Sequence, residues 1–193
     1  MTRSLLDLAQ RLLRGELRRA RRRKGASPLL IAVLLIAIFG LSRLLEQPET
    51  LPAKGAQLDC QVYRVYDGDT VTVDCDRGRV KVRVWGIDAP EMGQEPWGQR
   101  ARDRLRGLLP DAVRVQVVDT DRYGRAVARL YDGREDLGLA MVRQGQAAVY
   151  AQYNDSSAYR QAQSQARRER LGIWSQDGAQ QEPWAWRRVN PRG

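Results

Sequence analysis

Three short segments in the middle of the chain alternate apolar and polar residues and are joined by two tight turns. The alternation covers residues 58–66, 69–76 and 79–87, with Asp67-Gly68 and Arg77-Gly78 between them. An Asp-Gly turn between alternating runs is a strong sequence signal for a β-hairpin. The pattern predicts an antiparallel sheet of three consecutive strands, which any fold of this chain must accommodate.

Two further strands and three helices are predicted after these hairpins. The strands cover residues 113–118 and 126–130, and the helices cover residues 96–109, 137–143 and 155–171. Asn154 or Asp155 is the expected N-cap of the last helix. Five short strands with helices after the third and the fifth favour a small closed barrel over a parallel sheet. The predicted fold class is α+β.

An uncharged apolar segment precedes this domain. Residues 26–42 carry no charge, whereas residues 1–24 contain nine basic and two acidic residues. A bilayer-spanning helix needs roughly 17 to 25 apolar residues, and the basic block places the N-terminus in the cytoplasm and the domain outside it, in a single-pass topology. A cleaved signal peptide, which would release a secreted protein, and a buried helix are the alternatives. The predicted division is a basic cytoplasmic segment 1–25, a transmembrane signal-anchor helix 26–45, a linker 46–57, a folded domain 58–176 and a C-terminal tail 177–193.

Composition restricts the chemistry that the domain can perform. The sequence has no histidine and two cysteines, which excludes histidine-based triads and histidine-ligated zinc. A bound metal would be held mainly by oxygen, and oxygen ligands favour calcium, magnesium or manganese. The net charge of +10 is concentrated in the N-terminal block, since the residues after Lys24 include 24 basic and 21 acidic ones. Placed residues, and not the overall charge, must therefore support any nucleic-acid function.

Three short stretches combine residues suited to phosphodiester hydrolysis. They are Asp67-Gly68-Asp69-Thr70 at the first hairpin, Arg83 with Asp88-Ala89-Pro90-Glu91 at the end of the third strand, and Asp121-Arg122-Tyr123-Gly124-Arg125 in a later turn. Each stretch alone is compatible with an ordinary turn or a solvated loop. Together, Asp69 and Asp88 could bind a hard cation and Glu91 could hold a water molecule. Arg83 and Arg125 could each donate two hydrogen bonds to a phosphate.

These stretches, in this order and on these elements, resemble the staphylococcal nuclease (thermonuclease) family. The resemblance covers residues 58–174 and includes Ala140-Met141-Val142-Arg143-Gln144-Gly145 and Leu171-Gly172-Ile173-Trp174. It implies an OB-fold, which is a five-stranded Greek-key β-barrel with three helices. The implied activity is that of a calcium-dependent endonuclease, which hydrolyses single-stranded DNA and RNA by in-line water attack and leaves 3′-phosphate ends. A non-catalytic OB-fold module that binds nucleic acid or protein is the alternative.

The resemblance also implies individual roles at a metal site. Asp69 and Asp88 are the expected calcium ligands, together with the main-chain carbonyl of Ala89, which stands where the family often has threonine. Asp67 is expected beside the metal without binding it directly. Glu91 is the expected general base for the attacking water.

The remaining implied roles concern the substrate. Arg83 and Arg125 are expected to bind the phosphate and to stabilise its pentacovalent transition state, as catalytic residues. Tyr123 and Tyr153 match tyrosines that contact the nucleotide, with packing on the barrel surface as the alternative. Another such tyrosine position is Ala151 here, so the preference between DNA and RNA stays open. Nucleic acid and a membrane are the predicted partners of a monomer with no protein partner.

Cys60 and Cys75 are predicted to form a disulfide across the first hairpin. If Asp67-Gly68 is a two-residue turn, residues whose numbers sum to 135 face each other, which places the two cysteines opposite each other. Their Cα atoms would then be about 5.5 Å apart, within disulfide range. An extracytoplasmic location favours oxidation. Two reduced cysteines inside the barrel are the alternative.

The C-terminal tail is unusual because Trp184 and Trp186 lie beside Arg187 and Arg188. These residues could stack on bases, contact the membrane interface or pack back on the domain. The sequence leaves the three roles open.

Overall fold

The computed structural model describes Leu35 and residues 51–190. The chain divides into two units, residues 1–48 and residues 49–193. The predicted basic segment and signal-anchor helix lie outside the described residues except for Leu35, as does the first part of the predicted linker, so they stay predictions. In the part of the chain that is described, no helix is both long enough and apolar enough to cross a membrane.

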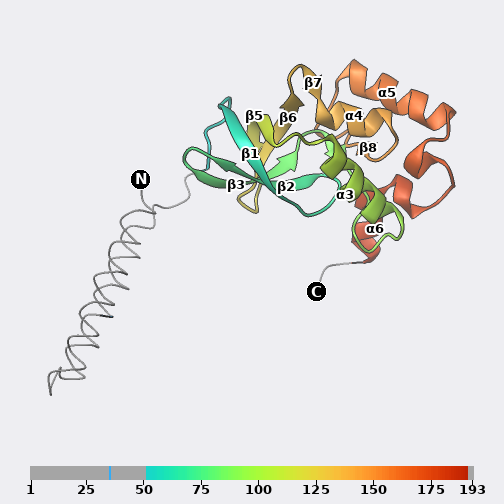
Figure 1. Cartoon of the computed structure of the whole chain (residues 1–193). Coiled ribbons are helices and arrows are strands. Elements are labelled where there is room, and N and C mark those ends of the chain that lie inside the picture. Colours follow the sequence, from blue (N-terminus) through green and yellow to red (C-terminus); the bar gives the residue numbers. More distant parts are fainter. Residues whose placement is uncertain (1–34, 36–50, 191–193) are drawn as a thin grey trace, which may run out of the picture. The chain divides into compact units, whose positions relative to one another are not determined.

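Five strands close into a barrel in the second unit (Figure 1). They are β1 (Gln57–Val65), β2 (Thr70–Cys75), β3 (Gly78–Val84), β5 (Ala112–Thr120) and β6 (Ala126–Asp132). Neighbours in the order β3-β2-β1-β5-β6 pair antiparallel, and β3 pairs with β6 in parallel, which closes the sheet. The prediction of a closed, OB-like five-stranded barrel in an α+β domain is confirmed.

Alternate positions of the strands fill the barrel interior. Val71 and Val73 of β2 and Val82 of β3 are fully buried, whereas Lys81 beside Val82 is exposed. This is the period-two pattern that predicted the strands. Burying each such valine stabilises the fold by roughly 1.5–3 kcal/mol. The inward-facing side chains of these strands therefore stabilise the barrel.

The helices of residues 51–190 include the three predicted ones and one more. They are α3 (Trp97–Leu108), α4 (Leu137–Arg143), α5 (Ser157–Arg168) and α6 (Pro183–Val189). The start predicted for α5 was two residues early, because Asn154 Oδ1 accepts a hydrogen bond from the Ser156 N–H and keeps this segment outside the helix. The helix ends before Arg170, whose φ of 54° is left-handed.

Several short elements were not predicted. They are β4 (Ile87–Asp88), β7 (Glu135–Asp136), β8 (Ala148–Val149) and the 3₁₀ turns η1 (Gly172–Trp174) and η2 (Ala179–Gln181). The prediction that the third strand continues to Ile87 was wrong, because Gly86 has a φ of 73° and turns the chain. After that turn β4 pairs with β8 instead, so Asp88 lies opposite Ala148.

Gly145 and Gly172 bring the ends of α4 and α5 into backbone contact. The Ile173 N–H donates a hydrogen bond to the Gly145 carbonyl oxygen at 2.7 Å. A Cβ on Gly172 would lie 2.6 Å from the Gly145 carbonyl carbon, so a larger residue would force the two segments apart. Both glycines also have positive φ, which L side chains rarely adopt. The two sequence stretches that contain these glycines therefore pack directly against each other.

Cys60 and Cys75 form a disulfide in the structure. Gln61 faces Asp74, so the paired residue numbers near the cysteines sum to 135, as predicted. A β-bulge changes this register nearer the turn, so the prediction of a two-residue turn was wrong. The predicted pairing of the two cysteines was right. The Cα atoms are 4.4 Å apart, the distance of a pair that lies between ladder hydrogen bonds.

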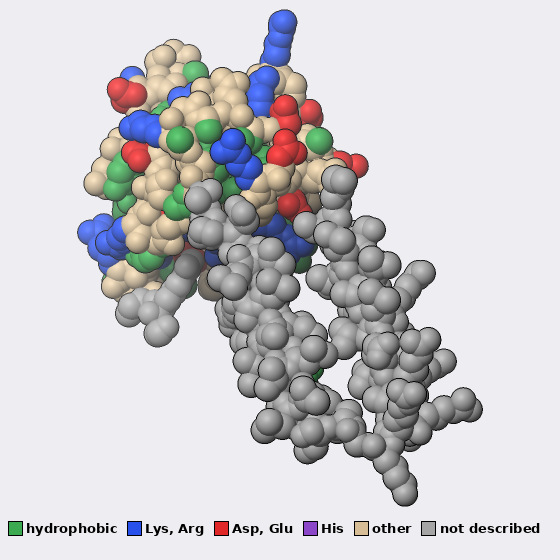
Figure 2. Space-filling view, turned by 90° about the vertical axis from the view of Figure 1, so that its left-hand side faces the viewer, with side chains coloured by type: hydrophobic (Ala, Val, Ile, Leu, Met, Phe, Trp, Pro, Cys, Tyr) green, Lys and Arg blue, Asp and Glu red, His purple; other side chains and the backbone are tan. Residues whose placement is uncertain are grey.

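Basic and acidic side chains are interspersed on the surface that Figure 2 shows. This agrees with the small excess of basic over acidic residues after Lys24. The predicted nucleic-acid contacts would therefore have to depend on where particular arginines are placed.

Candidate active site

The first two predicted stretches meet beside β3. Asp69 directly precedes β2, and Thr70 next to it faces Arg83 in the antiparallel register. Asp88 lies in β4, immediately after the turn that follows β3. Asp69 and Asp88 are buried, with exposed fractions of 2% and 0%, and Glu91 is 9% exposed. The hairpin and the β4–β8 pair thus gather three carboxylates in the protein interior.

Arg83 joins the two aspartates. One guanidinium nitrogen donates a hydrogen bond to Asp69 Oδ1, and the other donates to Asp88 Oδ1 at 2.7 Å. Burial lowers the pKa of Arg83, but the neighbouring charges of Asp69 and Asp88 outweigh burial and raise it. The guanidinium therefore stays charged and compensates two buried anions.

Asp69 has hydrogen bonds at both of its oxygens. Oδ1 also accepts from the Thr70 hydroxyl at 3.1 Å, and Oδ2 accepts from the main-chain N–H of Ala89 at 2.8 Å. This second bond ties the first hairpin to the loop after β4. The main chain of Ala89 therefore lies directly beside Asp69.

The loop that carries Glu91 is held by Gln94 and by α3. Gln94 Oε1 accepts from the Glu91 N–H at 2.8 Å, and the Gln94 N–H donates to the Glu91 carbonyl oxygen at 2.8 Å. A Cβ at Gly98 of α3 would lie 2.7 Å from the Glu91 carbonyl carbon, so the helix packs directly on this loop. Gln94 Nε2 donates to the carbonyl oxygen of Ala179 at 2.9 Å. The loop is thereby linked to the C-terminal segment as well.

Arg187 of α6 completes the cluster and was not predicted from the sequence. Its Nη1 donates to Asp88 Oδ1 and to Glu91 Oε1, each at 2.9 Å, and its Nη2 donates to Asp88 Oδ2 at 2.9 Å. Burial lowers the pKa of Arg187, and the bonds and charges of Asp88 and Glu91 outweigh burial and raise it. The tail therefore packs back on the domain, which is one of the three roles left open above.

Asp67 adds further negative charge next to Asp69. Its Oδ1 accepts from the Asp69 N–H at 3.0 Å. Burial and the charge of Asp69 raise the pKa of Asp67 to about 7. Burial and Asp69 also raise the pKa of Asp88, against the opposing effects of Arg187 and Arg83. An added positive charge would stabilise these carboxylates in their ionised form.

Arg125 lies close to β3 but is not joined to the cluster. Its Nε and Nη2 each contact Asp121 Oδ2 at 2.7 Å, within the turn before β6. Ala126 faces Val82 in the parallel β3–β6 pair, and both are buried. Since successive strand residues point to opposite faces, Arg125 and Arg83 both lie on the face away from this buried pair. The structure thus places Arg125 on the same face of the sheet as Arg83 and pairs it with Asp121.

The two predicted substrate tyrosines are exposed at different places. Tyr123 is 68% exposed, and the Arg125 guanidinium lies 5.6 Å from its ring centre. Tyr153 is 60% exposed and packs edge-on against Tyr150 at 4.9 Å. Tyr150 in turn stacks on Trp184 of α6, with 6.5 Å between ring centres. Tyr123 therefore adjoins the predicted phosphate arginine, and Tyr153 packs against Tyr150, which contacts the helix that carries Arg187.

The sequence of this chain is similar to the sequences of known nucleases. A family described as Staphylococcal nuclease homologue matches residues 81–176. A micrococcal nuclease of Shigella flexneri is 39% identical over 143 residues, and the match covers 67% of this chain and 80% of that protein. An uncharacterized endonuclease of Escherichia coli O157:H7 is 38% identical over 139 residues, covering 70% of this chain and 89% of that protein. The chain belongs to the staphylococcal nuclease family.

Members of the staphylococcal nuclease family are hydrolytic nucleases, and this chain is a hydrolase of that class. An uncharacterized endonuclease of Haemophilus influenzae, 38% identical over 131 residues, covers 67% of the chain and is matched over 72% of its own length. The family match contains Arg83, Asp88, Glu91 and Arg125. Asp69 precedes the matched range and is tied to it through Arg83 and Ala89.

The chemistry of the cluster fits a hard cation of the kind this nuclease family uses. Asp69 and Asp88 offer carboxylate oxygens, the ligands that calcium prefers, in a region rich in negative charge. Within Leu35 and residues 51–190, no three acidic, histidine or cysteine side chains are arranged to hold a metal ion. Arg83 and Arg187 instead take up the carboxylate oxygens. The donor types therefore fit a cation, and binding would require these arginine contacts to rearrange.

Proposed function

We propose that this nuclease is a calcium-dependent endonuclease that hydrolyses single-stranded DNA and RNA to products ending in 3′-phosphate. The observation that carries the proposal is the bridge that Arg83 makes between Asp69 and Asp88, with Glu91 in the same cluster through Arg187. Two buried carboxylates around one guanidinium have little use in stability alone, because such ion pairs repay their desolvation poorly. They are useful where a phosphate and a cation must meet.

Asp69, Asp88 and the main-chain carbonyl of Ala89 are proposed to hold the calcium ion, with Asp67 beside them. When bound, calcium would polarise a phosphoryl oxygen and offset the charge that develops on it. The Asp69–Ala89 hydrogen bond supports this assignment, because it keeps the two proposed ligand segments side by side. The proposal needs no histidine, in agreement with the composition.

Glu91 is proposed to accept a proton from the attacking water. The water oxygen forms a bond to phosphorus, the bond between phosphorus and the 5′-oxygen breaks in line with it, and the 5′-oxygen takes up a proton from solvent. Arg83 and Arg125 would donate hydrogen bonds to the phosphoryl oxygens as negative charge accumulates there. Tyr123, beside Arg125, and Tyr153 would contact the nucleotide.

The N-terminal segment is proposed to anchor this nuclease in a membrane as a single-pass monomer, with the catalytic domain outside the cytoplasm. The uncharged run 26–42 after the basic block supports an anchor, and the Cys60–Cys75 disulfide is compatible with an oxidising compartment. Alkaline carbonate should leave the full-length chain in the membrane pellet. Release into the supernatant would favour the secreted form instead.

The activity is tested with the full-length protein, purified in mild detergent, on single-stranded DNA with calcium or with a chelator. We expect hydrolysis only with calcium, and a loss of at least about 100-fold in kcat for Glu91→Gln and for Arg125→Ala. Glu95→Gln, an exposed acid in the loop of Glu91, and Arg134→Ala, an exposed arginine in the turn after β6, are the matched controls. Both should retain wild-type activity.

End-group analysis of the products completes the test. A 3′-phosphate supports the proposed bond cleavage, whereas a 5′-phosphate contradicts it. Hydrolysis that survives the chelator and both substitutions would overturn the mechanism. Binding of nucleic acid without hydrolysis would favour a binding module.

A further inference from the structure

Arg187 occupies the oxygens that a bound cation would need. Its guanidinium spans both oxygens of Asp88 and one oxygen of Glu91, with all three contacts at 2.9 Å. The Asp88 side chain is 0% exposed and the Arg187 side chain 30% exposed, so this positive charge enters the cluster from the surface. Arg83 already donates to Asp88 Oδ1 from the barrel side. Asp88 therefore has both carboxylate oxygens engaged by arginines.

A cation on Asp88 and the Arg187 guanidinium in this position exclude each other. The forked guanidinium takes up both oxygens of one carboxylate, as bidentate arginine–carboxylate pairs do. Arg83 and Arg187 already place two positive groups on Asp88, and a cation would add a third where water is largely absent. Arg187 supplies one positive charge where a divalent cation would supply two, against the three carboxylates of Asp69, Asp88 and Glu91.

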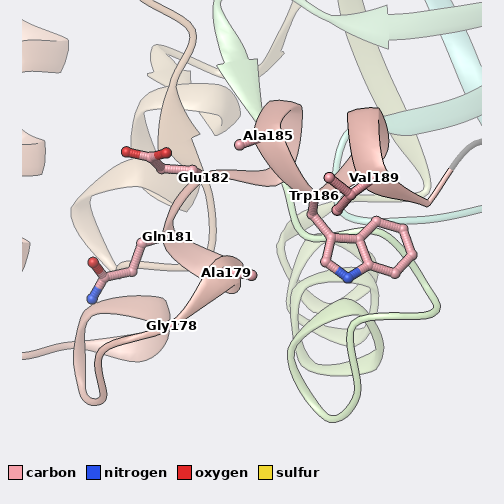
Figure 3. Close-up of a pocket in the computed structure, with 7 residues that line it drawn as sticks. All are labelled: Gly178, Ala179, Gln181, Glu182, Ala185, Trp186 and Val189. Carbon is pink, nitrogen blue, oxygen red and sulfur yellow. The ribbon is translucent and has the colours of Figure 1, made fainter.

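Other contacts of the C-terminal segment deliver Arg187 to this position. The Trp186 ring lies over Gly93, in the loop that follows Glu91, at 3.1 Å from the position of a Cβ at residue 93. Trp184 stacks on Tyr150 with an angle of 5° between the rings. Figure 3 shows Trp186 and Val189 of α6 beside the segment of Gly178 and Ala179, lining an open hollow. The two tryptophans that precede Arg187 in sequence therefore dock the helix beside the loop of Glu91.

We propose that Arg187 is an internal competitor of the activating cation, which must displace it from Asp88 and Glu91 before the site can work. The inference rests on the cation dependence in the proposed function. It makes α6 a segment whose docked position corresponds to the cation-free enzyme. It also makes Arg187 the residue that sets the cation concentration at which the enzyme becomes active.

Calcium binding without nucleic acid tests this inference. Isothermal titration of the full-length, chelator-stripped protein in mild detergent would compare the wild type with Arg187→Ala and Arg187→Gln. We expect both variants to bind calcium at least about fivefold more tightly, the lower end of coupling between two competing interactions. Arg188→Ala is the matched control, because Arg188 is exposed on the same helix and its substitution removes the same charge. Its calcium affinity should equal that of the wild type.

Hydrogen–deuterium exchange gives a second readout on the wild-type protein. Calcium should speed amide exchange in residues 183–189, because displacement of Arg187 removes one of the contacts that hold α6. Unchanged exchange, or a calcium affinity in both Arg187 variants that equals or falls below that of the wild type, would overturn the inference. If the wild type binds calcium and only these results fail, the proposed function survives. If no protein binds calcium, both proposals fail.

Discussion

The main-chain carbonyl group of Glu91 lies against the α-carbon of Gly98, with room for a hydrogen but not for a side chain. A Cβ at residue 98 would lie 2.7 Å from the Glu91 carbonyl carbon. Helix α3 therefore packs directly against the loop that carries Glu91 and fixes the distance between this loop and the helix. The same helix contains Gly107, where a Cβ would have no neighbour within 4 Å.

This relationship predicts that two alanine substitutions in one helix differ in their effect on kcat. Gly98→Ala should push the Glu91 loop outward and lower kcat by about 10- to 100-fold, since displacements of about 1 Å can cost that much. Gly107→Ala should leave kcat unchanged and raise stability by up to about 1 kcal/mol, because alanine favours helix more than glycine does. Steady-state kinetics and urea unfolding measure both effects. Wild-type kcat in the Gly98 variant would contradict this role of α3.

Removal of Arg83 should destabilise the cation-free protein strongly. Arg83→Leu leaves Asp69 and Asp88 buried without this shared partner, and breaking such pairs costs about 3–5 kcal/mol. Calcium should restore part of this stability by supplying positive charge at the same carboxylates. Arg79→Leu is the control on the same strand, because Arg79 pairs with Asp74 at the surface and should contribute less than about 1 kcal/mol. Equal losses of unfolding free energy in the two variants would contradict the prediction.

Asp67 should make the cation-free protein less stable as the pH rises. Its pKa is raised from 3.8 to about 7 by burial and by Asp69, so the folded chain binds this proton more tightly than the unfolded chain. The stability gained from the proton is complete below pH 3.8 and is lost as the pH rises through about 7. Asp67→Asn should remove this loss and be more stable than the wild type by more than about 1 kcal/mol at pH 8 in chelator.

Urea unfolding at a series of pH values measures the difference between the two proteins. The stabilities should converge towards pH 4, where wild-type Asp67 is protonated. Asp59→Asn, at an exposed position of β1, should show no such pH-dependent gain. A difference between wild type and Asp67→Asn that does not change with pH would contradict the assignment.

The disulfide should contribute measurably to the stability of the barrel. Cys60 and Cys75 are separated by 15 residues in sequence, and closing a loop of this length stabilises a fold by about 3 kcal/mol in the chain-entropy model. The Cys60→Ala, Cys75→Ala double variant should lose about this much unfolding free energy. Thiol titration of the unfolded, non-reduced wild type should find no free thiol, and a result of two would contradict the bond.

The acidic cluster could be predicted from the sequence because local geometry places most of it. The first hairpin sets Asp69 close to the cross-strand partner of Thr70, which is Arg83. Asp88 and Glu91 follow Arg83 within a few residues, so little freedom remains for them. The cysteine pairing was predictable for the same reason, since antiparallel register carries information across a hairpin.

Arg187 could not be predicted because its contacts depend on tertiary packing. Its guanidinium meets Glu91 across 96 residues of sequence, and α6 has 7 residues, too few to show a helical period. The one local signal is Pro183 at the first helical position, which often begins a helix. Arg125 shows the converse case, since the sequence predicted its role and the structure adds the competing partner Asp121.

Asp88 also belongs to the ladder between β4 and β8, where it lies opposite Ala148. Asp69, by contrast, belongs to the hairpin side of the barrel and reaches Arg83 across 14 residues. The two aspartates thus belong to two different parts of the domain. Asp69 adjoins the β2–β3 hairpin of the barrel, and Asp88 lies in the separate β4–β8 pair. A brief separation of the β4–β8 pair from the barrel would dismantle the site while the barrel stayed folded, because proteins open in local units before they unfold globally. Loss of nuclease activity would then report partial opening of this domain before any loss of its strands.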